Sequence, residues 1–327
     1  MTASDPCAHG EPGSERRSPD LSIIVVTHNR AALALTTLGS ARAAIGNLDV
    51  EWIIVDSGSS DGTPDAIAST YPDVLMLRER NIGFAAANNR GLRLARGRYV
   101  LLLNPDVETV SGTFEQLVAR MDAQLGIGIA SVVQKASDGR LQHSIRRYPS
   151  PWLALGEAIA APRWGPLGRW REEESRTALY TTEASVDWLV GAFLIARASA
   201  LAEVGALDER FFLYSEETDW CYRFHRAGWK VAHLPVMTVI HHSGDTSRPD
   251  LYAQLSYAKI LFAAKHWGRV RVLAMRAELA LRHATRLALS LALGRNRPQW
   301  TERARAERKA LAVVLGVTKP PFARSPS

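Results

Sequence analysis

Residues 21–27 are Leu-Ser-Ile-Ile-Val-Val-Thr, a continuous apolar run rich in β-branched side chains. Such a run is typical of a strand that is buried on both faces of a sheet. A second run of this kind, Glu-Trp-Ile-Ile-Val-Asp at 51–56, follows an Ala- and Leu-rich stretch over 31–45 that predicts a helix. These segments predict a strand–helix–strand unit whose two strands lie parallel in one sheet.

The alternation of strand and helix continues along the chain. Strands are predicted at 74–77, 99–103 and 127–133, with helices at 84–96, closed by Gly97, and at 112–123. Further on, we expect a strand from Trp188 to Ile195, a helix over 199–204, a helix from Glu216 to about residue 227, and one or two strands within 230–240. This order predicts an α/β fold with a mainly parallel central sheet flanked by helices.

Composition limits the class of protein. The chain has 327 residues, 46% hydrophobic and 22% charged, which is typical of a globular protein. Residues 1–20 are rich in Pro, Ser and charge without an apolar core, so we expect a disordered leader rather than a signal peptide. No stretch of about 18 apolar residues occurs, and Cys7 and Cys221 cannot form a disulfide framework. We therefore expect a cytoplasmic protein with free thiols.

The C-terminal part is strongly basic. From Arg269 to the end there are 13 Lys and Arg against 3 Asp and Glu, while the whole chain has a net charge of +7. Helical spacing of apolar residues over 251–293 and 300–315 predicts a basic helical extension covering 248–327. It either packs on the preceding domain or lies on an anionic membrane surface, where each basic residue contributes about 1 kcal/mol. No nucleic-acid-binding motif is present, so we expect no nucleic acid as partner.

Polar side chains follow three of the predicted strands directly. Thr27 and Asn29 come after the first strand, Asp56 after the second, and Asn104-Pro105-Asp106 after the strand at 99–103. In open parallel sheets, ligands bind beyond the carboxyl ends of the strands. Asp106 suits Mg²⁺ or Mn²⁺, which takes one or two carboxylates plus phosphate oxygens, although the Asn-Pro-Asp sequence is also an ordinary turn signal.

Three acids open the helix that starts at Glu216. Glu216, Glu217 and Asp219 are favoured there by the helix dipole alone, but one of them could also act as the general base, because crowded carboxylates have raised pKa values. His241 could complete a metal shell, or it could be a structural histidine. Gly83 permits a close backbone approach, and Asn88 follows it within a helix that could equally pack its small residues on the sheet.

Taken in order, these motifs resemble the family 2 glycosyltransferases of the GT-A fold, in particular their rhamnosyltransferase-like branch. The resemblance covers about residues 20–247, which we expect to form a catalytic domain over 21–247. The matching stretches are Ile24 to Arg30, Ile54 to Thr63, Asn81 to Phe84 with Asn88 and Gly91, Gly97 to Asp106, Gly191 to Phe193, Phe211 and Phe212 with Glu216, Glu217 and Asp219, and His241 to Gly244.

The resemblance implies a role for each matching residue. Asp106 stands in the family's Asp-x-Asp metal motif, whereas Asn104 departs from it and is expected at ribose or phosphate. Glu217 stands where many relatives carry the aspartate of a Glu-Asp pair proposed as the base, so the choice between the three acids stays open. The remaining donor-side residues are Thr27, Asn29, Arg30, Asp56, Gly83 and Asn88, with His241 beside the metal.

The resemblance also implies the reaction. A sugar, with rhamnose as the single best guess, would move with inversion from a dTDP- or UDP-linked donor to a glycan or polyprenyl-diphosphate-linked acceptor, assisted by Mg²⁺ or Mn²⁺. Two other classes remain as alternatives: a catalytically inactive sugar- or polyanion-binding module on the same fold, and a sugar nucleotidyltransferase. The second should carry a Gly-rich loop with Arg and Lys after the first strand, where this chain has Thr27-His28-Asn29-Arg30.

Overall fold

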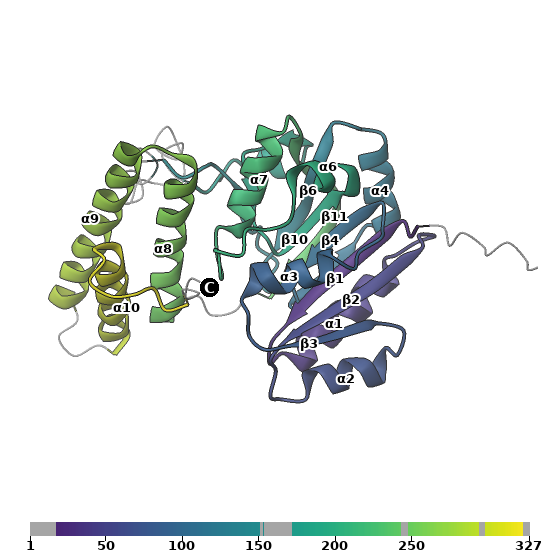
Figure 1. The fold of residues 1–327 in the computed structure, drawn as a ribbon, viewed down its shortest axis with the longest axis horizontal. Coiled ribbons are helices and arrows are strands. Elements are labelled where there is room, and N and C mark those ends of the chain that lie inside the picture. The colour runs from purple at the N-terminus through teal and green to yellow at the C-terminus, as the bar shows by residue number, and fades with distance from the viewer. Residues whose placement is uncertain (1–17, 151–152, 154–171, 243–247, 294–297, 323–327) are drawn as a thin grey trace, which may run out of the picture.

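The computed structural model of the chain describes residues 18–150, 153, 172–242, 248–293 and 298–322. In these residues, one nine-stranded sheet has the strand order β3-β2-β1-β4-β10-β6-β11-β5, with β8 beside β11 (Figure 1). The strands of its first half are β1 (Leu21–Thr27), β2 (Val50–Ser57), β3 (Leu75–Glu79) and β4 (Tyr99–Leu103). These four lie parallel, so the predicted α/β fold with a mainly parallel sheet is confirmed.

The second half of the sheet mixes directions. β10 (Phe193–Arg197) is antiparallel to both β4 and β6 (Ile127–Lys135), while β11 (Lys230–His241) is parallel to β6. β5 (Val107–Ser111) and β8 (Ala184–Ser185) pair antiparallel with β11. The strand β5, which the sequence did not predict, returns the chain directly after Asp106 and pairs with the end of β11.

The predicted strand from Trp188 to Ile195 is divided between two sheets. β9 (Trp188–Leu189) pairs with β7 (Ile145–Arg146), and the chain then turns at Gly191 before β10 joins the central sheet. The apolar run correctly predicted that these residues are buried. It wrongly predicted one continuous strand. The turn matters for the site, because a Cβ at Gly191 would lie 3.4 Å from the Glu217 Cβ.

Helices cover both faces of the sheet and give it two apolar cores. One core joins the sheet to α1 (Ala31–Ala43) and α4 (Phe114–Asp122), with α2 (Thr63–Thr70) at its edge; the other joins it to α3 (Phe84–Leu92), α6 (Ala198–Val204) and α7 (Glu216–Arg226). A short 3₁₀ helix, Thr177–Tyr180, packs on the second core. Cys221 of α7 is a free, fully buried thiol in that core, whereas Cys7 lies outside the described residues.

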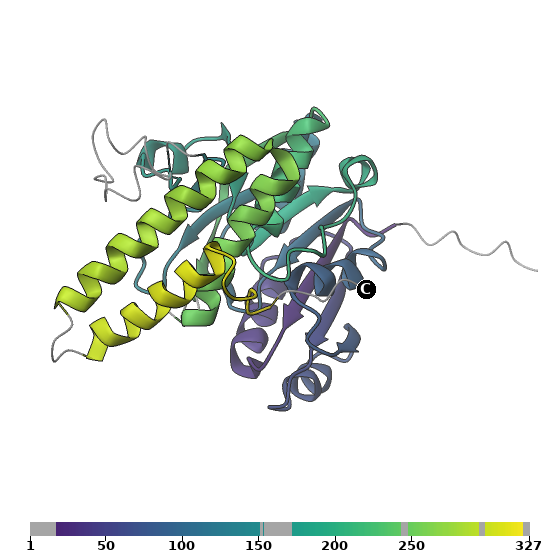
Figure 2. The same ribbon diagram turned by 60° about the vertical axis from the view of Figure 1, so that its left-hand side comes forward.

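The C-terminal extension is a separate helical layer beside the α7 side of the sheet (Figures 1 and 2). It comprises α8 (Pro249–His266), α9 (Arg269–Leu293) and α10 (Pro298–Val314), so the helical spacing predicted over 251–293 is interrupted at residues 267–268. The three helices share small cores of their own. Among the described residues, no helix is both long and apolar enough to cross a membrane.

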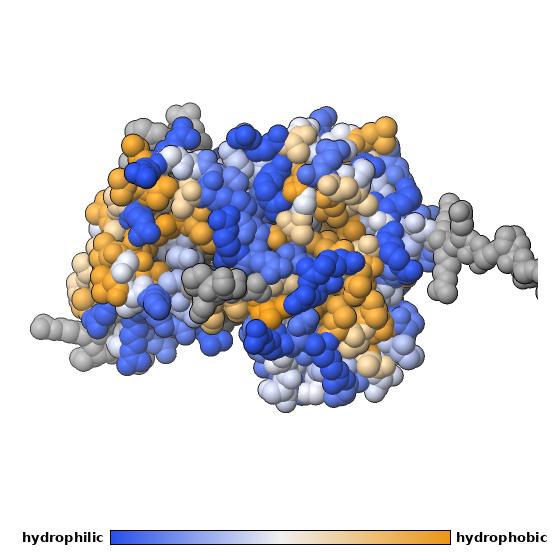
Figure 3. Space-filling view, viewed as in Figure 1, coloured by the Kyte–Doolittle hydropathy of each residue, from blue (hydrophilic) through white to orange (hydrophobic). Residues whose placement is uncertain are grey.

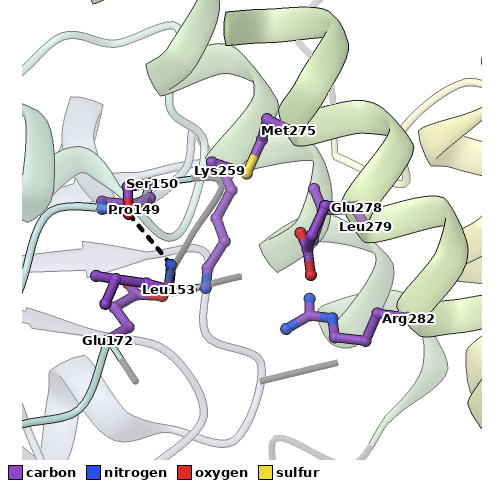
Figure 4. Close-up of a pocket in the computed structure, with 9 residues that line it drawn as sticks. All are labelled: Pro149, Ser150, Leu153, Glu172, Lys259, Met275, Glu278, Leu279 and Arg282. Carbon is purple, nitrogen blue, oxygen red and sulfur yellow. Dashed lines mark hydrogen bonds and ion pairs between the residues drawn. The ribbon is translucent and has the colours of Figure 1, made fainter. Parts of the chain in front are cut away.

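A buried ion pair joins the extension to the domain that contains the sheet. Lys259 of α8 contacts Glu172, and on α9 the Glu278 and Arg282 side chains point toward each other beside this pair (Figure 4). The space between these groups is about 10 Å³, enough for about one water molecule. This close packing indicates a contact between two layers rather than a ligand site.

The last residues of the leader predicted over 1–20 are part of the folded domain. Residues 1–17 lie outside the described part of the chain. Pro19 and Asp20 already belong to the sheet edge, because the backbone N–H groups of Arg98 and Tyr99 donate to their carbonyls at 3.0 and 3.1 Å. The Asp20 carboxylate also pairs with Arg98 at 3.0 Å. These last residues of the predicted leader are thus held by backbone pairing, which apolar patterning cannot reveal.

Candidate active site

A cavity of about 930 Å³ lies beyond the carboxyl ends of β1 and β4 and beside the N-terminus of α7. A volume of this size is typical of small-molecule sites. Six of the predicted site residues line it, namely Arg30, Asn104, Asp106, Glu216, Glu217 and His241. Because these residues come from distant segments of the chain, their meeting here is a property of the fold.

Asp106 is held in the cavity wall between two basic side chains. One carboxylate oxygen, Oδ2, accepts a hydrogen bond from Arg30 at 3.2 Å, and the other, Oδ1, lies 3.4 Å from His241 Nε2. The backbone fixes this arrangement, because the His242 N–H donates to the Asp106 carbonyl at 2.8 Å and β5 pairs with β11. His241 is oriented in turn by Gln142, whose Oε1 lies 3.2 Å from Nδ1.

The oxygen atoms of Asp106 and Asn104 could supply some, but not all, of the ligands that a hard divalent cation needs. Asn104 Oδ1 is buried without a hydrogen-bond partner, and Asp106 Oδ1 is buried with only the longer contact to His241, so both oxygens can still bind a ligand. Within the described residues, no group of three or more His, Cys, Asp or Glu side chains is arranged around one point. A site of this kind matches Mg²⁺ or Mn²⁺ bound by few protein groups and completed by diphosphate oxygens.

Thr27 and Asp56 stand side by side at the ends of β1 and β2, where they are partners in the parallel register. Asp56 Oδ2 accepts from the Ser59 N–H at 3.0 Å, while Asp56 Oδ1 and Thr27 Oγ1 are buried and have no hydrogen-bond partner. Neither residue lines the large cavity. Their unsatisfied oxygens mark a second polar spot at the same edge of the sheet, one strand away from Asn104.

Asn29 links the loop after β1 to the loop after β2 by hydrogen bonds. Its backbone has a positive φ of 51°, which asparagine tolerates better than most residues. The side-chain oxygen accepts from the Ser60 N–H at 2.7 Å, and the Asn29 N–H donates to Ser59 Oγ at 2.9 Å. The predicted donor-binding residue therefore ties the β1 and β2 loops together.

Glu216 and Glu217 form a pair of buried carboxylates at the start of α7. Each has one buried oxygen, Oε2, without a hydrogen-bond partner. Burial raises the pKa of Glu217 to about 7, and the nearby Glu172 carboxylate adds to this shift while Arg146 opposes it. Burial and the charge of Glu217 hold the pKa of Glu216 well above its ordinary value. At neutral pH such a pair can both accept and release a proton.

The backbone turn directly before Glu216 and Glu217 is strained. Tyr214 and Ser215, directly before α7, have positive φ values of 71° and 64°. Two consecutive non-glycine residues in the left-handed region are uncommon and cost free energy, and such strain gathers at functional sites. Tyr214 also lines the cavity, and burial raises its pKa to about 12. The strained turn therefore places a protonated phenol beside the two carboxylates.

The structure does not bring Asp219 to this cavity. Its carboxylate contacts Arg223 at 2.9 Å, Lys265 at 2.6 Å and His266 at 2.7 Å, which ties α7 to the end of α8. Burial opposes ionisation of Asp219, but these partners outweigh it and hold its pKa below the ordinary value. A fully paired, acidic carboxylate is a poor proton acceptor.

Gly83 and Asn88 are also placed away from the cavity lining. Gly83 has a φ of +88°, and a Cβ there would meet Phe212 at 2.7 Å, so the glycine lets the start of α3 approach the segment before α7. The side-chain amide of Asn88 donates to the Phe84 carbonyl at 3.0 Å, within α3 itself. Both residues serve the packing of α3 in this structure.

The cavity has a further wall that the motifs did not single out. It is formed by the end of β6 and the irregular region after it, and its polar members include Gln134, Arg140, Gln142, His143, Arg146 and Glu173. Arg146 lies 3.5 Å from Glu173. These residues follow no regular spacing, so the only signal in the sequence is the density of Arg and His after a buried strand.

A mainly parallel sheet of this strand order, with Asn104-Pro105-Asp106 at the carboxyl end of β4 and an acidic pair across the cavity, is the architecture of glycosyltransferases of the GT-A fold. The family model described as "Glycosyl transferase family 2" matches residues 22–183. The chain belongs to this family, and it is a glycosyltransferase. A short β1–α1 loop without a Gly-rich phosphate cradle agrees with this class rather than with a nucleotidyltransferase.

Rhamnosyltransferases are among its relatives. The chain is 30% identical over 301 residues to the N-acetylglucosaminyl-diphospho-decaprenol L-rhamnosyltransferase of Mycobacterium tuberculosis, covering 85% of this chain and 96% of that protein. It is also 24% identical over 157 residues to the rhamnosyltransferase WbbL of Escherichia coli, covering 48% of this chain and 56% of the relative.

A solved structure shares the fold along most of the chain. A mannosyltransferase from Pyrobaculum calidifontis, solved with GDP-Man and Mn²⁺, superimposes with a TM-score of 0.56 at 18% identity. The match covers 93% of this chain and 89% of that one.

Proposed function

We propose that the protein transfers a sugar, with L-rhamnose as the best candidate, from a nucleotide-diphosphate donor to a hydroxyl of a glycan acceptor carried on a polyprenyl diphosphate. The observation that carries this proposal is the shared cavity of Asp106 and Glu217. The name of the mycobacterial relative, which spans nearly its whole length in the match, supports rhamnose and a lipid-diphosphate acceptor. A dTDP- or UDP-linked sugar is the expected donor.

The donor would lie along the edge of the sheet from β2 to β4. Asp56 Oδ1 and Thr27 Oγ1 offer unsatisfied oxygens to the N–H and O–H groups of the base or ribose. Asn104 would meet the ribose or phosphate, and Arg30 would contact the diphosphate. Asp106, with His241 beside it, would hold Mg²⁺ or Mn²⁺, which supplies positive charge to the leaving diphosphate.

Glu217 is the proposed general base. The acceptor hydroxyl oxygen forms a bond to the anomeric carbon as the bond from that carbon to the diphosphate oxygen breaks, and the hydroxyl proton passes to Glu217. A single in-line displacement of this kind inverts the anomeric configuration. A carboxylate with a pKa near 7 is well matched to this task at neutral pH.

The acceptor would enter along the opposite wall. Arg140 and Arg146 provide positive charge suited to a diphosphate, and Leu213 and Leu251 provide apolar surface beside it. Leu251 belongs to the first turn of α8, so the extension contributes to this wall. A lipid-linked glycan presents both a diphosphate and an apolar chain, which matches this combination.

A panel of nucleotide sugars tests the proposal. The full chain is incubated with each donor and Mg²⁺ or Mn²⁺, with and without a polyprenyl-diphosphate N-acetylglucosamine acceptor, and nucleotide release and thermal shift are recorded. We expect release with dTDP-rhamnose that depends on both metal and acceptor. Thermal shift without release under any condition would indicate a binding module, and no response to any donor would contradict a donor site here.

A further inference from the structure

The outward face of α9 is apolar along its whole length. Val270 is 79% exposed, Leu273 65%, Leu281 54% and Leu291 54%, although each is a large aliphatic residue. Exposed alanines fill the gaps at helical spacing. We call this surface the α9 stripe, which consists of Val270, Leu273, Ala277, Leu281, Ala284, Ala288 and Leu291.

The stripe is continuous rather than a set of scattered residues. Its members are separated by three or four positions, which places them on one side of a helix. In the space-filling view, hydrophobic residues gather where α9 lies (Figures 1 and 3). Single exposed leucines are common, but a contiguous apolar surface of this kind indicates a partner.

The exposed charges of α9 and of the neighbouring helix α10 are mostly positive. Glu278 is the only acid in Arg269–Leu293, and it is buried at 9% exposure. Arg269 and Arg271 are exposed at the start of α9. On the neighbouring helix α10, which packs against both α8 and α9, the exposed basic residues include Arg303, Arg305 and Arg308, and the exposed acid is Glu302.

We propose that the α9 stripe docks in the interfacial layer of an anionic lipid bilayer, with the exposed arginines of α9 and α10 on its headgroups. A helix with an apolar face and basic flanks is suited to lie in the plane of that interface. Negative surface charge attracts the arginines independently of the apolar contact. A second copy of this chain fits less well, because it would bring two strongly basic extensions together.

The docking goes beyond the proposed function and can be tested without it. It would also serve that function, because the same helical layer contributes Leu251 to the cavity wall and Lys259 to the buried pair with Glu172. A bilayer held against α9 would keep the cavity close to lipid-linked acceptors. That consequence rests on the proposed acceptor, whereas the docking itself does not.

Vesicle co-sedimentation of the full chain, without donor or acceptor, tests the docking. Two kinds of vesicle are compared, phosphatidylcholine alone and an equal mixture of phosphatidylcholine and phosphatidylglycerol. We expect about tenfold stronger partitioning onto the mixed vesicles, and a decrease of about tenfold or more for the double variant Leu273→Ser/Leu281→Ser. The variant Arg305→Gln/Arg308→Gln should bind more weakly to the mixed vesicles only.

Leu125→Ser is the matched control, because Leu125 is 73% exposed and follows α4, a helix that lies across the sheet from the extension (Figure 1). It should bind vesicles like the unaltered protein. The proposal is overturned if the unaltered protein does not bind the mixed vesicles, or if the serine variant binds them equally well. It is also overturned if that variant lowers the melting temperature as a core change would, or if light scattering shows a dimer that the variant dissociates. Failure of nucleotide release would leave these outcomes unaffected.

Discussion

Asp106 and Glu217 share one cavity but have opposite electrical surroundings. Asp106 lies between the Arg30 guanidinium and the His241 imidazole, whereas the Glu217 carboxylate is buried next to Glu216 and feels the negative charge of Glu172. Two carboxylates in such different environments suit two roles, one as an ionised ligand and the other as a proton acceptor. The roles proposed for Asp106, as cation ligand, and Glu217, as general base, rest on these neighbouring groups.

Removing the charge of Asp106 should abolish the effect of the metal. For Asp106→Asn we expect kcat/KM to fall by about 100-fold or more, because Asp106 is the proposed main protein ligand of the cation. Donor affinity, measured by calorimetry, should then be the same with and without Mn²⁺. Asp73→Asn, which alters an exposed carboxylate paired with Arg42, serves as the control. Metal-dependent donor binding that persists in Asp106→Asn would remove this residue from the metal site.

The rate of transfer should rise with pH through about 7. Glu217 must be ionised to accept a proton, and its raised pKa means that it is protonated below that value. We therefore expect kcat/KM to fall as pH drops from about 8 to 6 and to level off above. The free energy of unfolding should change in the opposite direction. The folded state binds a proton at Glu217 more tightly than the unfolded state does, so protonation stabilises the fold. This stabilisation is lost as pH rises through about 7. If kcat/KM does not change across this pH range, a group other than Glu217 accepts the proton of the acceptor hydroxyl.

At the scale of elements, the position of the acidic pair depends on how α3 meets the segment before α7. Gly83 allows the contact, and the Phe84 N–H donates to the Phe212 carbonyl at 2.7 Å. The strained Tyr214 and Ser215 follow directly and open α7. We therefore expect a change in this contact to shift Glu216 and Glu217, which begin α7.

Gly83→Ala should disturb this contact more than an equivalent change elsewhere. A Cβ at Gly83 would lie 2.7 Å from a Phe212 ring carbon and 2.8 Å from its carbonyl oxygen. Gly62 has a similar φ of +79° but open space around it, so Gly62→Ala isolates the cost of the backbone conformation, about 1–2 kcal/mol. Chemical denaturation should show a larger loss for Gly83→Ala, together with reduced transfer. Equal losses for both variants would mean that the Phe212 contact adds nothing.

At the scale of the whole molecule, the extension is anchored to the catalytic domain by charges. Asp219 of α7 contacts Lys265 and His266 at the end of α8, and Glu172 pairs with Lys259 within α8. Both anchors lie on the side of the sheet that carries the proposed base. The extension therefore completes the cavity from outside the part of the chain that matches the family model.

Asp219→Asn should separate this structural role from catalysis. Loss of its charge leaves Arg223, Lys265 and His266 without their common partner, so we expect the melting temperature to fall by several degrees. Well below that temperature, kcat should stay within about threefold of the unaltered protein, because Asp219 does not line the cavity. A large loss of kcat with unchanged stability would return Asp219 to the candidates for the base.

Much of the catalytic domain could be predicted because apolar runs and polar strand ends are local signals. The runs at 21–27, 51–56 and 99–103 became β1, β2 and β4, and the side chains following them lie at one sheet edge. The partners of Asp219 could not be predicted, because they come from a helix that meets α7 only after folding. The turn at Gly191 and the strand β5 were missed for the same reason, since pairing decides them rather than composition.

The most direct test of the shared cavity compares donor binding with transfer in Glu217→Gln. The substitution keeps the shape of the side chain and removes its ability to accept a proton. Calorimetry should give donor affinity in the presence of Mn²⁺ within about twofold of the unaltered protein, while nucleotide release with acceptor falls by about 100-fold or more. Unchanged nucleotide release, or loss of donor binding as complete as in Asp106→Asn, would contradict the assignment of donor and base to opposite sides of this cavity.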